Sequence, residues 1–212
     1  TIKRMAQKGK FPYSDVAILY RMNALSRSIE SALRDQGIPF RIYGGMRFYD
    51  RKEIKDVFAY LRLIADSKDN LAFERIINVP KRGIGDTTVD NIMMLALREN
   101  TDCLSICARA MEFPELSRAS GKLLSFYALI ESFRNELDKN LLTFAEFIDM
   151  VENKSGIIDG IIAERESKGE LIDRVENLKE LLSEAVEFEK KRRNGDEFTA
   201  PPTDDMKAQS EA

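Results

Sequence analysis

VAILYRMN (residues 16–23) is the stretch that decides the fold, because a short apolar run ends here in an aromatic residue and an arginine. A continuous apolar run of this length is typical of a buried strand. Asn23 then caps a predicted helix, which Gly37 closes. Ligands of open α/β sheets bind beyond the carboxyl ends of the strands, so Tyr20 and Arg21 lie where a nucleotide is expected.

A second short strand is predicted at 40–43, which completes a strand–helix–strand pattern typical of a βαβ unit. The rest of the chain has helical spacing of its apolar residues. The expected helices cover residues 51–65, 69–78, 88–99, 102–112, 115–138, 143–153, 157–166 and 169–191. Residues 195–212 are polar and are predicted to form a flexible tail. We therefore predict a mostly α fold with a small parallel β portion.

The composition supports a globular protein, since 43% of the 212 residues are hydrophobic. No stretch reaches the roughly 18 consecutive apolar residues that a membrane span needs. The charge is unevenly distributed: residues 1–85 hold 17 Lys and Arg against 9 Asp and Glu, and the remainder holds 16 against 27. A basic first part suggests a surface that faces phosphates. Helix surfaces that simply differ in charge explain the asymmetry equally well.

The two cysteines, Cys103 and Cys107, stand four residues apart in a chain without histidine. Zinc takes four nitrogen or sulfur ligands in structural sites, so we predict no metal site here. Two buried thiols in the reducing cytoplasm are the better interpretation. The chain also opens on Thr1 rather than Met, which we take to indicate a piece of a longer protein.

The segment FRIYGGMRFYDRKEIKD (40–56) interleaves aromatic residues with cations. Arg47 and Arg51 flank Phe48 and Tyr49, a pattern that binds single-stranded DNA by stacking and by phosphate contacts. The alternative is that both aromatic side chains fill the core while Glu53 pairs with an arginine.

A glycine-containing turn at 80–85 precedes a predicted helix. The backbone N–H groups at Gly83 and Gly85, together with the charges of Lys81 and Arg82, are suited to DNA phosphates. A plain turn between helices explains the same residues equally well.

A polar turn at 154–156 separates two further predicted helices. Lys154, Ser155 and Gly156 are candidates for holding a phosphate of duplex DNA at the start of the second helix. As a sequence pattern it is no more than a polar turn.

Taken in order, several segments resemble the superfamily 1 DNA helicases of the UvrD/PcrA/Rep group. They are AILYRMNALSRSIESAL (17–33), FRIYGGMRFYDRKEIKDVFAYLRLIADSKDN (40–70), FERIINVPKRGIGDTTVDNI (73–92) and, more weakly, ENLKELLSEAVEFEK (176–190). The resemblance implies that residues 1–113 are the first portion of the second RecA-like domain (2A), a truncated α/β unit. Residues 114–194 would then be most of the all-helical 2B subdomain, which contacts duplex DNA.

The function that this resemblance implies is that of a fragment of a 3′→5′ ATP-dependent DNA helicase or translocase, acting in DNA repair or replication in the cytoplasm. Tyr20 looks like the family's adenine-stacking aromatic residue, and Arg21 is similar to the catalytic arginine that contacts the γ-phosphate. The implied partners are single- and double-stranded DNA, the missing first RecA-like domain of the same parent chain, and repair proteins.

The chain departs from the family pattern in important places. Leu25 stands where the family often has glutamine, and there is no G-x-x-x-x-G-K-[ST] loop and no acidic magnesium motif. ATP and Mg²⁺ are therefore expected to bind in the parent enzyme, with none bound to this fragment, which is expected to be inactive alone. Two alternatives remain open: a non-catalytic regulatory module that binds DNA or protein, and part of a recombination-type helicase–nuclease subunit.

Overall fold

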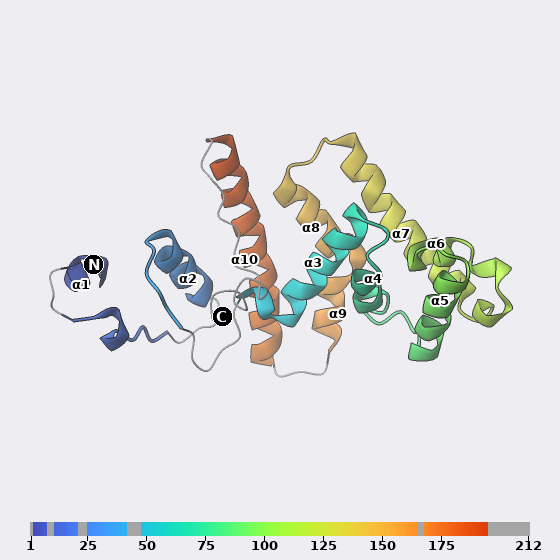
Figure 1. The fold of residues 1–212 in the computed structure, drawn as a ribbon, viewed down its shortest axis with the longest axis horizontal. Coiled ribbons are helices and arrows are strands. Elements are labelled where there is room, and N and C mark those ends of the chain that lie inside the picture. The colour runs from blue at the N-terminus through green and yellow to red at the C-terminus, as the bar shows by residue number, and fades with distance from the viewer. Residues whose placement is uncertain (1, 8–10, 21–24, 42–47, 165–167, 195–212) are drawn as a thin grey trace.

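The structure is a computed structural model that describes residues 2–7, 11–20, 25–41, 48–164 and 168–194, and every regular element in these ranges is a helix (Figure 1). With η marking 3₁₀ turns, the elements are α1 (Ile2–Gln7), η1 (Tyr13–Asp15), α2 (Leu25–Asp35), η2 (Phe48–Asp50), α3 (Lys52–Ala65), α4 (Asn70–Ile76), α5 (Asp86–Arg98), α6 (Cys103–Ala108), η3 (Ala110–Glu112), η4 (Pro114–Leu116), α7 (Ser120–Lys139), α8 (Phe144–Ser155), α9 (Ile157–Ala163) and α10 (Lys168–Arg193). The prediction of a mostly helical chain is confirmed.

Helix α3 organises the packing of the helical body. It lies against α4, α7, α8 and α10, while α6 packs between α5 and α7 (Figure 1). The apolar side chains of α3 that face these neighbours are fully buried, among them Ile54, Val57 and Leu63. Burying a side chain of this size contributes roughly 1.5–3 kcal/mol. The core formed in this way determines where the turns between the helices lie.

The small parallel β portion is not shown in the described residues. Residues 16–20 have neither helix nor strand structure, and 42–43 of the second expected strand lie outside the described ranges. A strand needs a neighbour that accepts and donates its backbone hydrogen bonds, and the described part of the chain supplies none. Leu19 is 94% exposed as a result, although its run of apolar residues is typical of a buried strand.

Several helices begin at side chains that cap their first turn. The carboxylate of Asp69 accepts a hydrogen bond from the Ala72 N–H, and Asp102 does the same for Ser105. Thr143 and Glu146 form a reciprocal capping box at the start of α8. These local contacts explain why most of the described helices begin within a few residues of the predicted positions.

The predicted division near residue 113 does not interrupt the core. Phe73 of α4 and Phe126 of α7 lie on opposite sides of that point in the sequence, yet their ring centroids are 5.9 Å apart in an edge-on arrangement. One cluster of buried apolar residues runs from Phe48 to Ala185. The described helices α3 to α10 therefore share a single core, and the division into 2A and 2B portions stays a prediction.

Candidate nucleic-acid interface

Of the residues predicted to meet the nucleotide, the structure describes only Tyr20. This tyrosine is 37% exposed at the end of the extended segment 16–20, and Arg21 lies outside the described residues. The adenine-stacking and γ-phosphate roles stay predictions.

Arg51, predicted to contact DNA, is only 7% exposed and points into the protein. Its guanidinium donates a hydrogen bond to the amide oxygen of Asn177 on α10 and lies 5.3 Å from the ring centroid of Phe48. The Asn177 amide nitrogen in turn donates to Glu53 at 2.6 Å. These contacts favour the structural alternative, since Phe48 fills the core, Tyr49 packs partly buried against it and Glu53 pairs with Arg174 at 3.6 Å. In addition, Arg51 connects the start of α3 to α10. Arg47, its predicted companion, lies outside the described residues.

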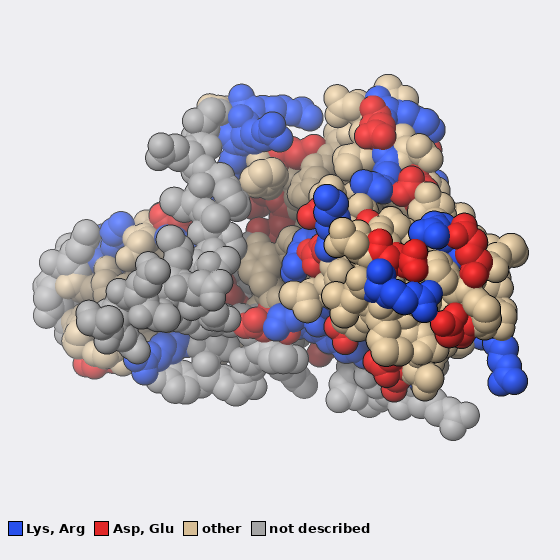
Figure 2. Space-filling model, turned by 45° about the vertical axis from the view of Figure 1, so that its right-hand side comes forward, with Lys and Arg blue, Asp and Glu red and all other residues tan. Residues whose placement is uncertain are grey.

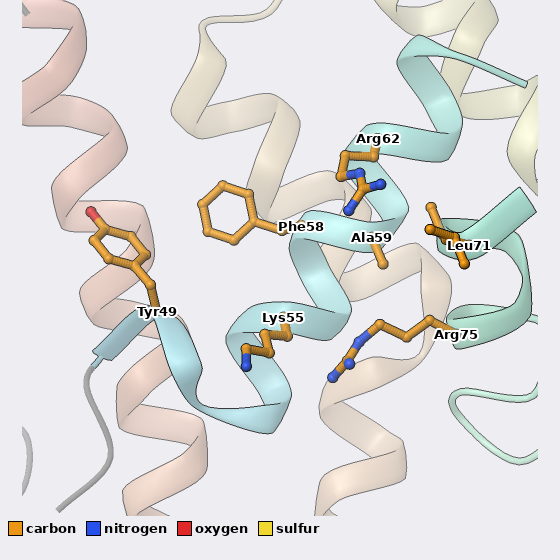
Figure 3. A pocket seen from close by; sticks show the side chains of 8 residues that line it. Tyr49, Lys55, Phe58, Ala59, Arg62, Leu71 and Arg75 are labelled. Carbon is orange, nitrogen blue, oxygen red and sulfur yellow. The ribbon is translucent and has the colours of Figure 1, made fainter. Parts of the chain in front are cut away.

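A pocket of about 440 Å³ lies between α3 and α4, near the aromatic segment (Figure 3). Tyr49, Phe58 and Leu71 supply apolar surface, and Lys55, Arg62 and Arg75 supply positive charge. Each of these cations already has an acidic partner. The pairs are Lys55–Asp50 at 3.4 Å, Arg62–Asp69 at 2.7 Å and Arg75–Asp56 at 2.8 Å. The positive charge left for an anionic ligand in this pocket is therefore small.

The turn at residues 80–85, called here the 80–85 turn, has a backbone fixed by hydrogen bonds to a neighbouring side chain. The Asn78 amide oxygen accepts hydrogen bonds from the N–H groups of Arg82 at 2.7 Å and Ile84 at 3.4 Å. Ile84 is 1% exposed and anchors the turn in the core. Gly83 has φ +67°, a left-handed conformation that favours glycine. Among the described residues, none accepts a hydrogen bond from the backbone N–H of Gly83 or Gly85.

The charged side chains at the 80–85 turn point in different directions. The Lys81 side chain is exposed, whereas the Arg82 guanidinium is directed inward, to backbone carbonyls and to the hydroxyl of Tyr60. Lys122, from the first turn of α7, places its ammonium 2.8 Å from the Gly83 carbonyl oxygen. The packing of α7 therefore brings a second lysine to a turn that already carries the exposed Lys81, and no sequence pattern singled out Lys122.

The polar turn at residues 154–156, called here the 154–156 turn, ends α8. Gly156 adopts φ +81°, and Ser155 is 5% exposed. The Ser155 carbonyl accepts a hydrogen bond of 3.1 Å from Arg82. The structure thus brings the 80–85 turn and the 154–156 turn together, a relationship that neither motif predicts by itself.

Lys154 itself is exposed and belongs to a different environment from Lys81. The pKa of Glu136 on α7 is lowered mainly by its hydrogen bond and charge interaction with Lys139, and further by the charge of Lys154. Lys154 therefore lies close enough to the second half of α7 to interact with the Glu136 carboxylate. Lys122 lies in the first turn of α7, so the two lysines are near opposite ends of this helix.

The face shown in Figure 2 carries no broad field of one sign. Lys and Arg side chains are interspersed with Asp and Glu over most of its described surface (Figure 2). The uneven distribution of charge along the sequence is thus not reproduced as a basic half of this face. An anionic ligand on such a surface would be held by a local group of donors rather than by a long-range potential.

Burial changes the acidity of two groups close to the turns. The pKa of Tyr60 is raised to about 12 by burial, against the opposing charge and hydrogen bond of Arg82, so its hydroxyl keeps its proton. The pKa of Glu152 is raised to about 8, first by burial and then by the charge of Asp149. Glu152 is 1% exposed, and one of its carboxyl oxygens has no hydrogen-bond partner among the described residues.

The cysteines are consistent with the prediction of buried thiols. Cys103 and Cys107 are 1% and 0% exposed, and burial raises the pKa of Cys103 to about 11. No group of three or more Cys, Asp or Glu side chains suited to a metal ion occurs within the described ranges. None of the helices in the part of the chain that the structure describes is long and apolar enough to cross a membrane.

Comparison with known proteins identifies the family. The model of the UvrD-like helicase C-terminal domain matches residues 1–200. The chain is 41% identical over 189 residues to the ATP-dependent DNA helicase PcrA of Staphylococcus epidermidis, and 40% identical over 189 residues to the PcrA of Staphylococcus aureus. Each match covers 89% of this chain and 25% of the relative, so the chain spans about a quarter of their length. The chain belongs to the UvrD-like helicase C-terminal domain family, in the UvrD/PcrA group of superfamily 1.

Proposed function

We propose that the chain is a piece of a 3′→5′ ATP-dependent DNA helicase or translocase, and that it holds duplex DNA at the 80–85 turn. The family membership and the names of the relatives support the parent activity. Because the chain corresponds to a quarter of those relatives, ATP hydrolysis and unwinding belong to the whole parent protein. DNA contact is the part of that activity for which the described residues provide chemical groups.

The observation that carries the proposal is the set of donors at the 80–85 turn. The N–H groups of Gly83 and Gly85 have no acceptor within the described structure, the ammonium group of Lys122 lies 2.8 Å from the Gly83 carbonyl oxygen, and Lys81 is an exposed lysine of the same turn. Backbone N–H groups and lysines are the usual partners of DNA phosphates and carry no sequence information. We therefore expect binding that depends strongly on salt and little on base sequence.

The remaining roles follow from the resemblance alone. In the parent, residues 16–20 would pair with strands of the second RecA-like domain, which would cover the exposed apolar side chains of Ile18 and Leu19. Tyr20 and Arg21 would then face ATP and Mg²⁺ held mainly by the first RecA-like domain. Of the 154–156 turn, the exposed Lys154 would contact a further stretch of the duplex, whereas the buried Ser155 would support the 80–85 turn through Arg82. A single strand would lie nearer the aromatic segment at 40–56.

Binding of the 212-residue chain to a fluorescent duplex with a single-stranded 3′ tail, measured by anisotropy across a range of salt concentrations, tests the proposal. The variant Lys81→Ala should weaken binding about two- to five-fold and reduce the slope of log affinity against log salt by about 0.9, the value for one lost phosphate contact. The matched control is Lys179→Ala, which removes an exposed lysine from α10. Equal affinities for wild type and Lys81→Ala, or equal losses in both variants, would contradict this role of the turn.

A further inference from the structure

The two terminal nitrogens of Arg82 both donate to protein acceptors, and the ring of Phe126 lies beside the guanidinium. Nη1 lies within hydrogen-bonding distance of four backbone carbonyls near the end of α4. They belong to Ile76 at 3.1 Å, Ile77 at 3.4 Å, Val79 at 2.8 Å and Pro80 at 3.3 Å. Nη2 donates to the Tyr60 hydroxyl at 2.6 Å and to the Ser155 carbonyl at 3.1 Å. The guanidinium carbon lies 5.3 Å from the ring centroid of Phe126.

These contacts come from four separate helices and their ends. Tyr60 belongs to α3, Phe126 belongs to α7 and Ser155 ends α8. The four backbone carbonyls lie at the end of α4 and in the residues directly after it. A guanidinium has five N–H donors in a fixed plane, and here both terminal nitrogens donate to protein acceptors. A DNA phosphate could reach them only by displacing acceptors that hold the core together.

A second contact, without any charge, joins the 80–85 turn to Gly156 and to the helix α9 that follows it. The ring of Pro80 packs on Gly160 of α9, where an added Cβ would lie 2.6 Å from the Pro80 Cβ. At Gly156 an added Cβ would lie 3.5 Å from the Pro80 ring, which is an ordinary contact distance. The close approach of the 80–85 turn to α9 therefore requires glycine at position 160.

We propose that Arg82 is a positioning residue that fastens the 80–85 turn to the 154–156 turn, so that duplex affinity depends on Arg82 although its guanidinium does not contact DNA. This inference rests on the proposed duplex binding at the 80–85 turn. It replaces the prediction of a direct phosphate contact with an indirect role, exerted through the placement of Lys81 and of the glycine N–H groups. Lysine cannot substitute for it, because a single ammonium cannot reach acceptors on several helices at once.

A double-mutant cycle on duplex affinity separates positioning from direct contact. We compare Lys81→Ala in the wild-type background with Lys81→Ala combined with Arg82→Lys, Arg82→Gln or Gly160→Ala. If Arg82 positions the turn, Arg82→Lys should lower affinity as much as Arg82→Gln, about two- to five-fold, and Lys81→Ala should then add less than it does alone. Gly160→Ala should have the same effect while leaving every charge in place.

Thermal unfolding of each variant tests whether it is folded at the temperature of the binding measurement. Gly121→Ala, with no atom beyond its own stretch of helix within 4 Å of the added Cβ, is the matched glycine control. Should the Arg82 variants not fold, the Gly160→Ala cycle decides the question by itself. The positioning role would be overturned in favour of a phosphate contact if Arg82→Lys kept full duplex affinity while the affinity losses of Arg82→Gln and Lys81→Ala were additive in the double mutant. Unchanged affinity in folded Gly160→Ala would also overturn it. A wild-type chain without salt-dependent duplex binding would instead refute the proposed function itself.

Discussion

Arg82 donates a hydrogen bond of 3.1 Å to the backbone carbonyl of Ser155, which lies 73 residues further along the chain. This contact joins two turns that look like independent polar loops in the sequence. The hydroxyl of Tyr60 completes the arrangement, since it accepts a hydrogen bond from Arg82 and donates one of 2.6 Å to the Val79 carbonyl. The turn that we propose to bind DNA is thus supported by a hydrogen-bond network beneath it.

The substitution Tyr60→Phe should destabilise the protein by about 1–3 kcal/mol, because the Val79 carbonyl and Arg82 lose a partner while the ring stays in place. Urea unfolding of wild type and variant measures the difference. The control is Tyr127→Phe on α7, a partly buried tyrosine without a recorded hydrogen bond through its hydroxyl, which should change stability by no more than about 0.5 kcal/mol. Equal stabilities of wild type and Tyr60→Phe would show that the network contributes nothing.

Glu152 should make the protein less stable as the pH rises. Its pKa is about 8 in the folded chain against an ordinary value of 4.5, so the folded state binds this proton more tightly than the unfolded state. The contribution of Glu152 to stability is therefore fully present below pH 4.5 and is lost progressively between pH 4.5 and pH 8. Glutamine cannot ionise, so Glu152→Gln should become more stable relative to wild type as the pH increases.

Chemical unfolding of both proteins at several pH values between 5 and 8.5 tests this expectation. The stability difference should grow to several kcal/mol by pH 8. The matched control is Glu187→Gln, which makes the same change at an exposed position of α10. A Glu152→Gln difference that does not change with pH would refute the prediction.

The substitution Asn177→Ala should separate α10 from α3. It removes an acceptor of the buried Arg51 and a donor to the buried Glu53, and each lost hydrogen bond between buried polar groups costs about 1–3 kcal/mol. Urea unfolding should show a loss of about 2–5 kcal/mol, compared with a small change for Asn91→Ala on α5, where no side-chain hydrogen bond is recorded. A loss as small as that of the control would mean that water replaces the missing amide.

The 212-residue chain by itself should not hydrolyse ATP, with or without DNA. Its sequence contains no phosphate-binding loop and no acidic magnesium motif, so the groups that hold the β- and γ-phosphates and their metal are absent. A coupled assay for ADP release with purified chain, Mg²⁺ and single-stranded DNA makes the measurement. Turnover that follows the protein through purification would contradict our interpretation of the chain as one part of a motor.

The local sequence was sufficient for most of the helices and for the positions of their ends. The helix predicted at 143–153 is observed at Phe144–Ser155, because Thr143 caps its start and Gly156 can adopt the left-handed conformation at its end. The strand predicted at 15–20 is not shown in the described structure, for the opposite reason. A strand is stabilised by a neighbouring strand, and apolar character alone does not supply one.

Sequence patterns did not predict the direction in which Arg51 and Arg82 point. Arg51 and Arg82 stand beside aromatic residues and glycines in the sequence, as DNA-binding arginines do. In the structure, however, they donate hydrogen bonds inward, to Asn177 and to Ser155 respectively. Asn177 and Ser155 lie 126 and 73 residues away along the chain, so no local pattern contains these two acceptors, although Arg82 also donates to carbonyls of residues 76–80 nearby. Lys122 was missed for the same reason, since only the packing of α7 brings it to Gly83.

The sequence by itself determined the family, the helical character and the two polar turns, because each depends on residues that are close together in the chain. Only the tertiary structure decided which cations face solvent and which support the core. That choice depends on backbone carbonyls and side-chain acceptors that become neighbours only when α3, α4, α7 and α8 pack together.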